Sequence, residues 1–299
     1  MCLTAILFVL SSVSGDQELA RRATAILETA EAQRLQVSSA ALTVRQVLRT
    51  HEGEAFLLSK VVFDGDRCRF DVLDGTVYEA IAGELGELPT IKESFVVEGD
   101  NMLNRTNIPA SCPFTISKRA DVFDFHPLVL GLPGRPDTTS EVARCLRKDW
   151  KPVQLIEDSP DGCVQVSLVP TRPESNKSQK LTLTFDPGKD WAPIKFMLSS
   201  KHASGTVYEI YSTSSLQLLG GHWYPKSVYH LQTRNGEFNW SVQYDVLEAS
   251  ANPVIDAAQF TWEGLGIADG THVTSKVTGI SSFVWKAMKN SKALILQPR

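Results

Sequence analysis

Three Trp-x-Pro triplets stand in the second half of this chain, and each leads into a run in which apolar and polar residues alternate. The triplets are Trp150-Lys151-Pro152, Trp191-Ala192-Pro193 and Trp223-Tyr224-Pro225. Proline has no N–H to donate to a sheet and holds the preceding residue in an extended conformation, so it is accepted at the start or the exposed edge of a strand. The triplets therefore predict three strand starts. Each tryptophan is expected to cover the end of an apolar layer, with stacking on a ligand as the alternative.

Two β-hairpins are the clearest local signals. Residues 181–185 and 194–198 alternate on either side of the turn Asp186-Pro187-Gly188. Residues 224–233 and 237–246 meet across Asn235-Gly236, a dipeptide that favours the tight turn of a hairpin. Each hairpin is expected to have one apolar face. The predicted members are Leu181, Leu183, Phe185, Ile194, Phe196 and Leu198 in the first, and Trp240, Val242, Tyr244 and Val246 in the second.

The rest of the chain is predicted to combine an amphipathic helix, further strands and two short helices. Residues 16–35 carry apolar side chains at helical spacing. The stretch 83–114 has little periodicity, and we expect loops there around one strand near 95–97. Residues 121–130 and 139–148 are predicted to be helical. Period-two patterns predict further strands at 42–48, 56–63, 68–72 and 207–219, the last one broken at 212–215.

These elements predict an α+β fold that is mainly β. We expect one antiparallel, strongly curved sheet that forms an open, incomplete β-barrel. The N-terminal helix and the inserted helices should cover its concave side. Near closure protects the sheet edges and leaves an apolar interior that helices or a ligand can fill. No linker-like stretch divides the chain, so residues 16–299 are predicted to form a single β domain.

The first fifteen residues have the outline of a secretory signal peptide. Residues 3–10 form an apolar run, and small residues follow at Val13-Ser14-Gly15. The run is too short for a membrane-spanning helix, which needs about 20 apolar residues. No Lys or Arg precedes the run, so a start further upstream or a first core element is the alternative. We expect residues 1–15 to be a signal peptide and the protein to be exported, to the periplasm or the cell envelope.

The charge of the chain argues against nucleic acid as a partner. Its formal net charge is −4 with both signs mixed along the sequence, whereas nucleic-acid-binding proteins usually present a basic patch. Four cysteines remain after the apolar start, and export would permit disulfides among them. Their spacing fits no metal site. Two alternatives stay open for these cysteines: one disulfide, or buried free thiols. The four cysteines are Cys68, Cys112, Cys145 and Cys163.

The sequence contains no constellation that would carry catalysis or hold a metal or cofactor. The six histidines are scattered, and H-x-H, H-E-x-x-H, G-x-S-x-G, Walker and G-x-G-x-x-G motifs are absent. Asp124 and His126, in Asp124-Phe125-His126, are a weak candidate for a catalytic pair, and capping of a helix end explains them more simply. His222, beside a strand start, is expected to be a solvated turn residue. We therefore expect a protein that is not an enzyme and that has no cofactor and no metal.

Two groups of residues resemble a known family. Phe185-Asp186-Pro187 with Trp191-Ala192-Pro193-Ile194, followed by Gly220-Gly221-His222-Trp223-Tyr224-Pro225-Lys226, is similar to the paired hairpin motifs of the LolA/LolB/RseB-like superfamily of periplasmic lipoprotein carriers and sensors. Phe260-Thr261-Trp262-Glu263-Gly264-Leu265-Gly266 resembles the end of related, uncharacterised exported proteins. The resemblance covers mainly residues 181–273. It implies an unclosed barrel, a non-catalytic apolar cavity and the handling of acyl chains or peptides. This chain is longer than the small carriers and has no match to the residues that hold their lid.

Three functional hypotheses follow. The first is an exported binding protein that shelters a lipid or lipoprotein acyl chain. Its ligand-lining candidates are Ile194, Phe196, Trp240 and Tyr244, with packing in the core as the alternative for each. The second is a periplasmic sensor or scaffold that binds a protein partner, such as a membrane-associated one, along a sheet edge. A long unpaired edge near 207–215 would favour it. The third, a hydrolase at the barrel mouth, has the least support because no nucleophile, base and orienting group can be named.

Overall fold

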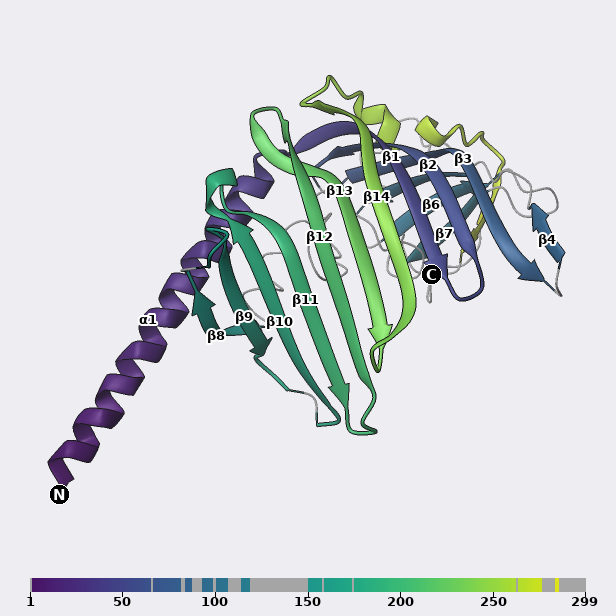
Figure 1. Ribbon diagram of the computed structural model, residues 1–299. Coiled ribbons are helices and arrows are strands. Elements are labelled where there is room, and N and C mark those ends of the chain that lie inside the picture. Colours follow the sequence, from purple (N-terminus) through teal and green to yellow (C-terminus); the bar gives the residue numbers. More distant parts are fainter. Residues whose placement is uncertain are drawn as a thin grey trace. The chain divides into compact units, whose positions relative to one another are not determined.

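The computed structural model contains two compact units (Figure 1). Unit 1 comprises residues 1–37, 128–136 and 140–244. Unit 2 comprises residues 38–127, 137–139 and 245–299. The structure describes residues 2–65, 67–81, 84–87, 93–98, 101–106, 114–118, 150–157, 159–173, 175–261, 263–275 and 283–284. The helices expected at 121–130 and 139–148 lie outside the described residues. The signal peptide over 1–15 and the single domain over 16–299 stay predictions.

Unit 1 is a sheet with one long helix, α1 (Cys2–Leu35), against it. Its strands are β8 (Trp150–Ile156), β9 (Val164–Pro170), β10 (Lys177–Asp186), β11 (Ala192–His202), β12 (Val207–Leu219), β13 (His222–Arg234) and β14 (Glu237–Ala251), the last as far as Tyr244. Each strand lies beside the next one in sequence, and β8 to β13 pair antiparallel. Among these described strands no pairing joins β8 to β14, so the sheet is open. The predicted mainly-β, antiparallel, open fold with an N-terminal helix is confirmed.

The three Trp-x-Pro triplets lie at strand starts, as predicted. Trp150 begins β8, Trp191 immediately precedes β11, and Trp223 is the second residue of β13. The strand expected at 207–219 is β12. The predicted break at 212–215 is wrong, because these residues all pair with β13. Backbone pairing with a neighbouring strand outweighs the weak strand preference of serine.

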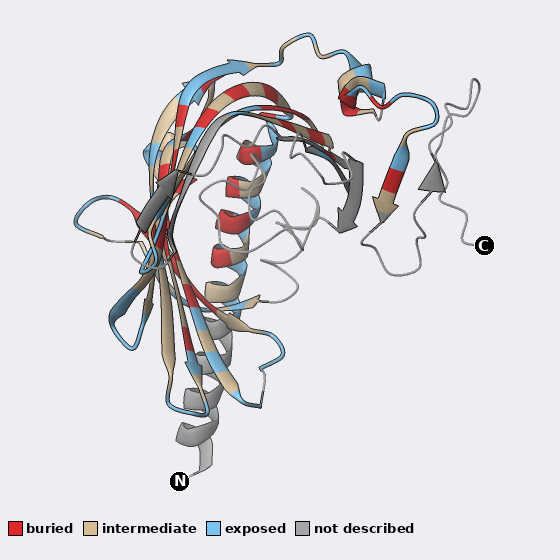
Figure 2. Ribbon diagram, turned by 90° about the vertical axis from the view of Figure 1, so that its right-hand side faces the viewer, coloured by how far each residue is buried: buried red, intermediate tan, exposed pale blue. Residues whose placement is uncertain are grey.

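Helix α1 packs an apolar stripe against the sheet. Ala23, Ile26, Leu27 and Ala30 recur at intervals of three and four residues, so they share one face of the helix, and all four are buried. Figure 2 shows the buried positions of α1 turned toward the strands. They pack on a cluster made of Val164, Val166, Leu168, Leu181, Leu183, Phe185 and Phe196. The helix predicted over 16–35 is confirmed, and it begins earlier, at Cys2. In the part of the chain that is described, no helix is long and apolar enough to span a bilayer.

The β10–β11 hairpin carries a β-bulge that changes which residues face α1. Leu183 lies opposite Phe196, as the alternation predicts, but the register shifts just before Phe185, which lies opposite Pro193. A bulge inserts one extra residue into one strand, and Ile194 is that residue here. Pro193 is accordingly buried, whereas Ile194 is half-buried. The apolar face of this hairpin therefore holds Pro193 at the position expected for Ile194.

Unit 2 is built from a second run of strands. They are β1 (Ser39–Thr50), β2 (Glu54–Asp64), β3 (Arg67–Ile81), β4 (Glu84–Glu87), β5 (Glu93–Glu98), β6 (Asn101–Thr106), β7 (Phe114–Lys118), β15 (His272–Ser275) and β16 (Phe283–Val284). The order is β1-β2-β3-β5-β6-β7-β15-β16, next to the end of β14, with β4 paired to β3. Strand β15 pairs in parallel with β7, which departs from the expected antiparallel pattern. Strands β1, β2, β3 and β5 confirm predictions, whereas β4, β6, β7, β15 and β16 were not predicted.

Two of the four cysteines considered lie in described segments. Cys68 is buried in β3 of unit 2, and Cys163 is buried immediately before β9 of unit 1. Cys112 and Cys145 lie outside the described residues. Burial of small apolar thiols is the expected behaviour of cysteine.

The glycine-containing run near the end of the chain forms two short 3-10 helices in unit 2. They are η5 (Ala257–Phe260) and η6 (Glu263–Leu265). Phe260 and Leu265 are buried in an apolar cluster with Val62, Val96, Ile267 and Val273. The motif that suggested a family resemblance therefore has a packing role in this chain.

Two arginines hold these helices through backbone carbonyls. Arg69 donates a hydrogen bond to the carbonyl of Gly264 at 2.9 Å, and Arg105 donates one to the carbonyl of Leu265 at 2.8 Å. Arg69 also bonds the carboxylate of Asp71 at 2.9 Å. Carbonyls at the end of a short helix lack helical partners, and the guanidinium groups supply them.

We expect Gly264→Ala to lower the free energy of unfolding by about 2 kcal/mol, the usual cost of overpacking. A Cβ at this position would lie 2.0 Å from the backbone oxygen of Ala258, and no rotamer change relieves a clash with backbone. Gly270→Ala is the control, because its Cβ would stand in open space and only its φ of +86° opposes alanine, at about 1 kcal/mol. Urea denaturation measures both variants. Equal stability of Gly264→Ala and the wild type would contradict this packing.

Candidate functional site

A strip of rings crosses the sheet face of unit 1 that packs against α1. The ring centroids of Phe196 in β11 and His230 in β13 lie 5.7 Å apart. Those of His230 and Tyr244 in β14 lie 6.0 Å apart, with the rings at 78° to each other. Ser212 of β12 lies between the first two, because it is the cross-strand partner of both. Cross-strand partners point to the same face. We call Phe196, His230 and Tyr244 the ring strip.

The ring strip carries no charge at neutral pH. Phe196 and Tyr244 are buried and His230 is half-buried. Burial lowers the pKa of His230 to about 4 from its ordinary 6.5. The imidazole is therefore neutral near pH 7, with one nitrogen able to donate a hydrogen bond and the other able to accept one.

Two serine hydroxyls beside the ring strip have no hydrogen-bond partner. Ser212 is only 2% exposed, and neither its Oγ nor that of Ser214 makes a hydrogen bond. Ser214 lies two residues further along β12, on the same face, and its cross-strand partner is the fully buried Val228. A buried hydroxyl without a partner costs about 1–3 kcal/mol, so each such group calls for an explanation.

Two other serines on strands of unit 1 have partners. The hydroxyl of Ser167 lies 3.1 Å from that of Thr182 on the neighbouring strand, and the hydroxyl of Ser200 accepts from the side-chain amide of Gln179 at 3.0 Å. The described residues include two further buried side-chain atoms without a hydrogen bond, Nε2 of Gln217 in β12 and Oγ1 of Thr233 in β13, so the unpartnered groups gather on these two strands.

The structure brings two of the four ligand-lining candidates into the ring strip. These are Phe196 and Tyr244, joined by His230, which was not among the predicted candidates. Ile194 is half-buried at the bulge. Trp240 is half-buried on β14, and two consecutive buried residues, Ser241 and Val242, interrupt the period-two pattern that grouped it with Tyr244. A ligand-lining role for the four candidates stays a prediction.

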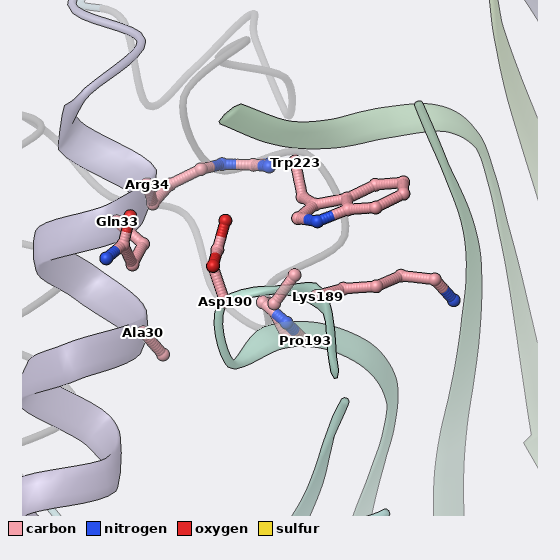
Figure 3. Close-up of a pocket in the computed structure, with 8 residues that line it drawn as sticks. Ala30, Gln33, Arg34, Lys189, Asp190, Pro193 and Trp223 are labelled. Atoms are coloured by element: carbon pink, nitrogen blue, oxygen red, sulfur yellow. The ribbon is translucent and has the colours of Figure 1, made fainter. Parts of the chain in front are cut away.

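A small pocket opens at the C-terminal end of α1, and Figure 3 shows the side chains around it. Its empty volume is about 230 Å³, open solvent included. Its walls come from α1, from the corner between β10 and β11, and from the start of β13. The lining residues are Ala30, Gln33, Arg34, Lys189, Asp190, Ala192, Pro193 and Trp223. Two of the Trp-x-Pro triplets therefore meet at this end of the helix–sheet interface.

The cationic side chains at the pocket lie over aromatic rings. Arg34 is buried with its guanidinium 4.8 Å from the ring centroid of Tyr224, and burial lowers the pKa of Arg34 to about 10, so it stays protonated at neutral pH. Lys189 pairs with the carboxylate of Asp186 at 2.8 Å and lies 5.7 Å from the ring centroid of Trp223. Cations favour the faces of aromatic rings. Contact with this lysine favours a packing role for Trp223 over stacking on a ligand.

The backbone corner beside this pocket is strained. Asp190 and Trp191 both have left-handed φ values, 54° and 60°, which a bulky residue such as tryptophan rarely adopts. The corner is held by Asp186, whose carbonyl accepts from the Trp191 N–H at 3.1 Å and whose carboxylate accepts from the Gly188 N–H at 2.9 Å. These bonds set the turn that places Trp191 at the end of the cluster under α1.

The described residues contain no cluster of three or more His, Cys, Asp or Glu side chains that could hold a metal ion. His222 begins β13 and is half-buried, where a solvated turn residue was expected. Asp124-Phe125-His126 lies outside the described residues. The ring strip is uncharged near pH 7, and the two serine hydroxyls beside it are potential hydrogen-bond donors.

Comparison with known proteins gives similar structures but no matching sequence. A LolA superfamily protein from Nitrosomonas europaea is 16% identical over 81% of this chain and 98% of its own, with a TM-score of 0.48. A putative outer membrane lipoprotein-sorting protein domain from Vibrio parahaemolyticus is 11% identical over 83% and 100%, with a TM-score of 0.49. A DUF1329 family protein from Desulfovibrio piger is 10% identical over 83% and 99%, with a TM-score of 0.43.

No protein-family model and no curated protein matches the sequence. The LolA superfamily, to which the hairpin motifs show a resemblance, thus appears among the similar structures. Identities of 10–16% transfer no residue role, ligand or activity to this chain.

Proposed function

We propose that this protein is an exported, non-catalytic binding protein that shelters an apolar ligand, a lipid or lipoprotein acyl chain, on the helix-covered face of unit 1. The observation that carries the proposal is the ring strip, in which Phe196, His230 and Tyr244 form an uncharged row on three strands. An apolar chain placed there gains about 0.8 kcal/mol for each methylene removed from water. Because His230 is neutral near pH 7, no charge has to be desolvated when the chain binds.

Binding of a protein partner through a sheet edge has less support. A long unpaired edge near 207–215 would favour it, but β12 is paired on both sides over Tyr208–Thr213. The described edge of unit 1 is β8, where Pro152 lacks an N–H and the register shifts between Pro152 and Gln154. Proline and bulges are the features by which proteins protect edges from pairing. A membrane-associated protein that delivers or receives the ligand is compatible with the proposal, whereas nucleic acid is not.

Catalysis by the ring strip has no geometric support either. Ser212 and His230 are cross-strand partners, the residue types of a hydrolytic dyad, but the hydroxyl of Ser212 makes no hydrogen bond. Nucleophilic catalysis needs the base within hydrogen-bond reach of the nucleophile and a third group that orients the base. Hydrolysis of an ester substrate that is lost in His230→Ala would contradict a purely binding role.

We expect native mass spectrometry of the protein, purified under mild conditions from the compartment where it resides, to show a discrete adduct that organic solvent releases.

We further expect Tyr244→Ala to weaken binding of the apolar dye N-phenyl-1-naphthylamine about tenfold, which corresponds to about 1.4 kcal/mol, because the substitution removes a ring from the ring strip.

Tyr229→Ala is the matched control for this experiment. Tyr229 is the neighbour of His230 in β13, so it points to the opposite face, and it is 38% exposed. It should leave dye binding unchanged. A clean polypeptide mass together with equal dye binding by both variants would contradict the proposed function.

A further inference from the structure

The hydroxyls of Ser212 and Ser214 need hydrogen-bond acceptors that the described protein does not provide. Both Oγ atoms are buried and make no hydrogen bond. The cross-strand partners are Phe196 and His230 for Ser212, and Val228 for Ser214. Phe196 and Val228 are buried, and the Ser212 hydroxyl makes no hydrogen bond to the imidazole of His230. Alanine at either position would fill nearly the same space without the free-energy cost of a buried hydroxyl that makes no hydrogen bond.

The spacing of the two hydroxyls constrains the ligand. Residues two apart on a strand lie about 7 Å apart and point to the same face. A single oxygen atom cannot accept from both groups at the usual O–H···O distance of about 2.7–2.8 Å. The pair therefore suits a ligand with two separate acceptors at this spacing, with apolar chains beside them to cover the ring strip.

We propose that Ser212 and Ser214 donate hydrogen bonds to two carbonyl oxygens of a diacyl ester, so that the site selects diacyl lipids over apolar chains without carbonyls. This inference rests on the proposed function and names the ligand class. An ester carbonyl accepts but does not donate, and a serine hydroxyl can do both, so the pairing is complementary. The diacylglyceryl group occurs both in free lipids and on lipid-modified proteins, and the two sources share this chemistry.

A matched pair of probes tests the inference. 1,2-Dioctanoylglycerol has two ester carbonyls, and 1,2-di-O-octylglycerol has the same chains joined by ethers. Each is titrated against the wild-type protein carrying N-phenyl-1-naphthylamine. We expect the ester to displace the dye at about tenfold lower concentration, since each neutral hydrogen bond contributes modestly. In Ser212→Ala/Ser214→Ala the ester and the ether should displace it equally, while ether binding stays as in the wild type.

The stability of the same variants gives an independent readout. Ser212→Ala should raise the urea midpoint of the ligand-free protein, because it removes a buried hydroxyl that has no partner. Ser167→Ala is the matched control: it should lower the midpoint, because it leaves Thr182 without the bond at 3.1 Å, and it should keep the ester preference. The mass of the adduct in the native mass spectrum distinguishes a free lipid from a lipid-modified protein.

The outcomes separate the two proposals. If neither probe displaces the dye from the wild type, the proposed function fails. If both displace it equally, apolar binding stands and the diacyl ester inference is overturned. A lower urea midpoint in Ser212→Ala would also overturn the inference, since it would mean that the hydroxyl has a partner within the protein.

Discussion

Replacing Phe185 with alanine should lower the free energy of unfolding by about 4 kcal/mol, within the range for buried Phe→Ala changes. Phe185 is 1% exposed and belongs to the cluster on which α1 packs. The cavity would open between the helix and the sheet, where neither element can close it without losing other contacts. Urea denaturation followed by circular dichroism measures the effect.

The control for this prediction is Ile194→Ala. Ile194 is the extra residue of the bulge and is half-buried, because Pro193 takes the position opposite Phe185. We expect its truncation to cost about 1 kcal/mol, as for partly exposed apolar residues. If the two variants lose stability equally, the register of the β10–β11 hairpin is not the one described.

The unfolding free energy should fall by about 3 kcal/mol between pH 6.5 and pH 4 because of His230 alone. Burial lowers the pKa of His230 to about 4 in the folded protein, whereas 6.5 is its ordinary value. Above pH 6.5 the residue is neutral in both states and contributes no pH dependence. As the pH falls below 6.5 the unfolded chain takes up the proton first, which favours unfolding. Below about pH 4 the folded protein also takes it up, and the loss levels off.

His230→Asn should remove this component from a series of urea titrations over the same pH range. The same protonation should release an apolar ligand from the ring strip, since a charged imidazole there would be desolvated. A pH profile that is identical in the wild type and His230→Asn would contradict the described burial of His230.

Local sequence chemistry was enough to predict most of the strands of unit 1. The β13–β14 hairpin needs two left-handed residues at its turn, and Asn235 and Gly236 have φ values of 54° and 83°. The stripe of α1 at helical spacing and the prolines at strand starts are signals of the same kind. Each depends on residues within a few positions of one another, which is why a single sequence reveals them.

Strands with weak local signals were missed for the same reason. Strand β6 (Asn101–Thr106) is short and mostly polar, and its place comes from pairing with β5 and β7. The bond between Arg105 and the carbonyl of Leu265 joins residues far apart in the chain. Partners at such separations leave no periodic trace in the sequence.

The sequence by itself determined that the protein is mainly β, that a helix lies against its sheet, and that Phe196 and Tyr244 are apolar candidates for a site. The tertiary structure alone decided their neighbours, because register sets which side chains meet across strands. It inserted Ile194 as a bulge, set His230 between the two rings, and left Ser212 without a hydrogen-bond partner. Alternation predicts which side of a strand a residue faces, whereas contact across strands depends on pairings between distant segments.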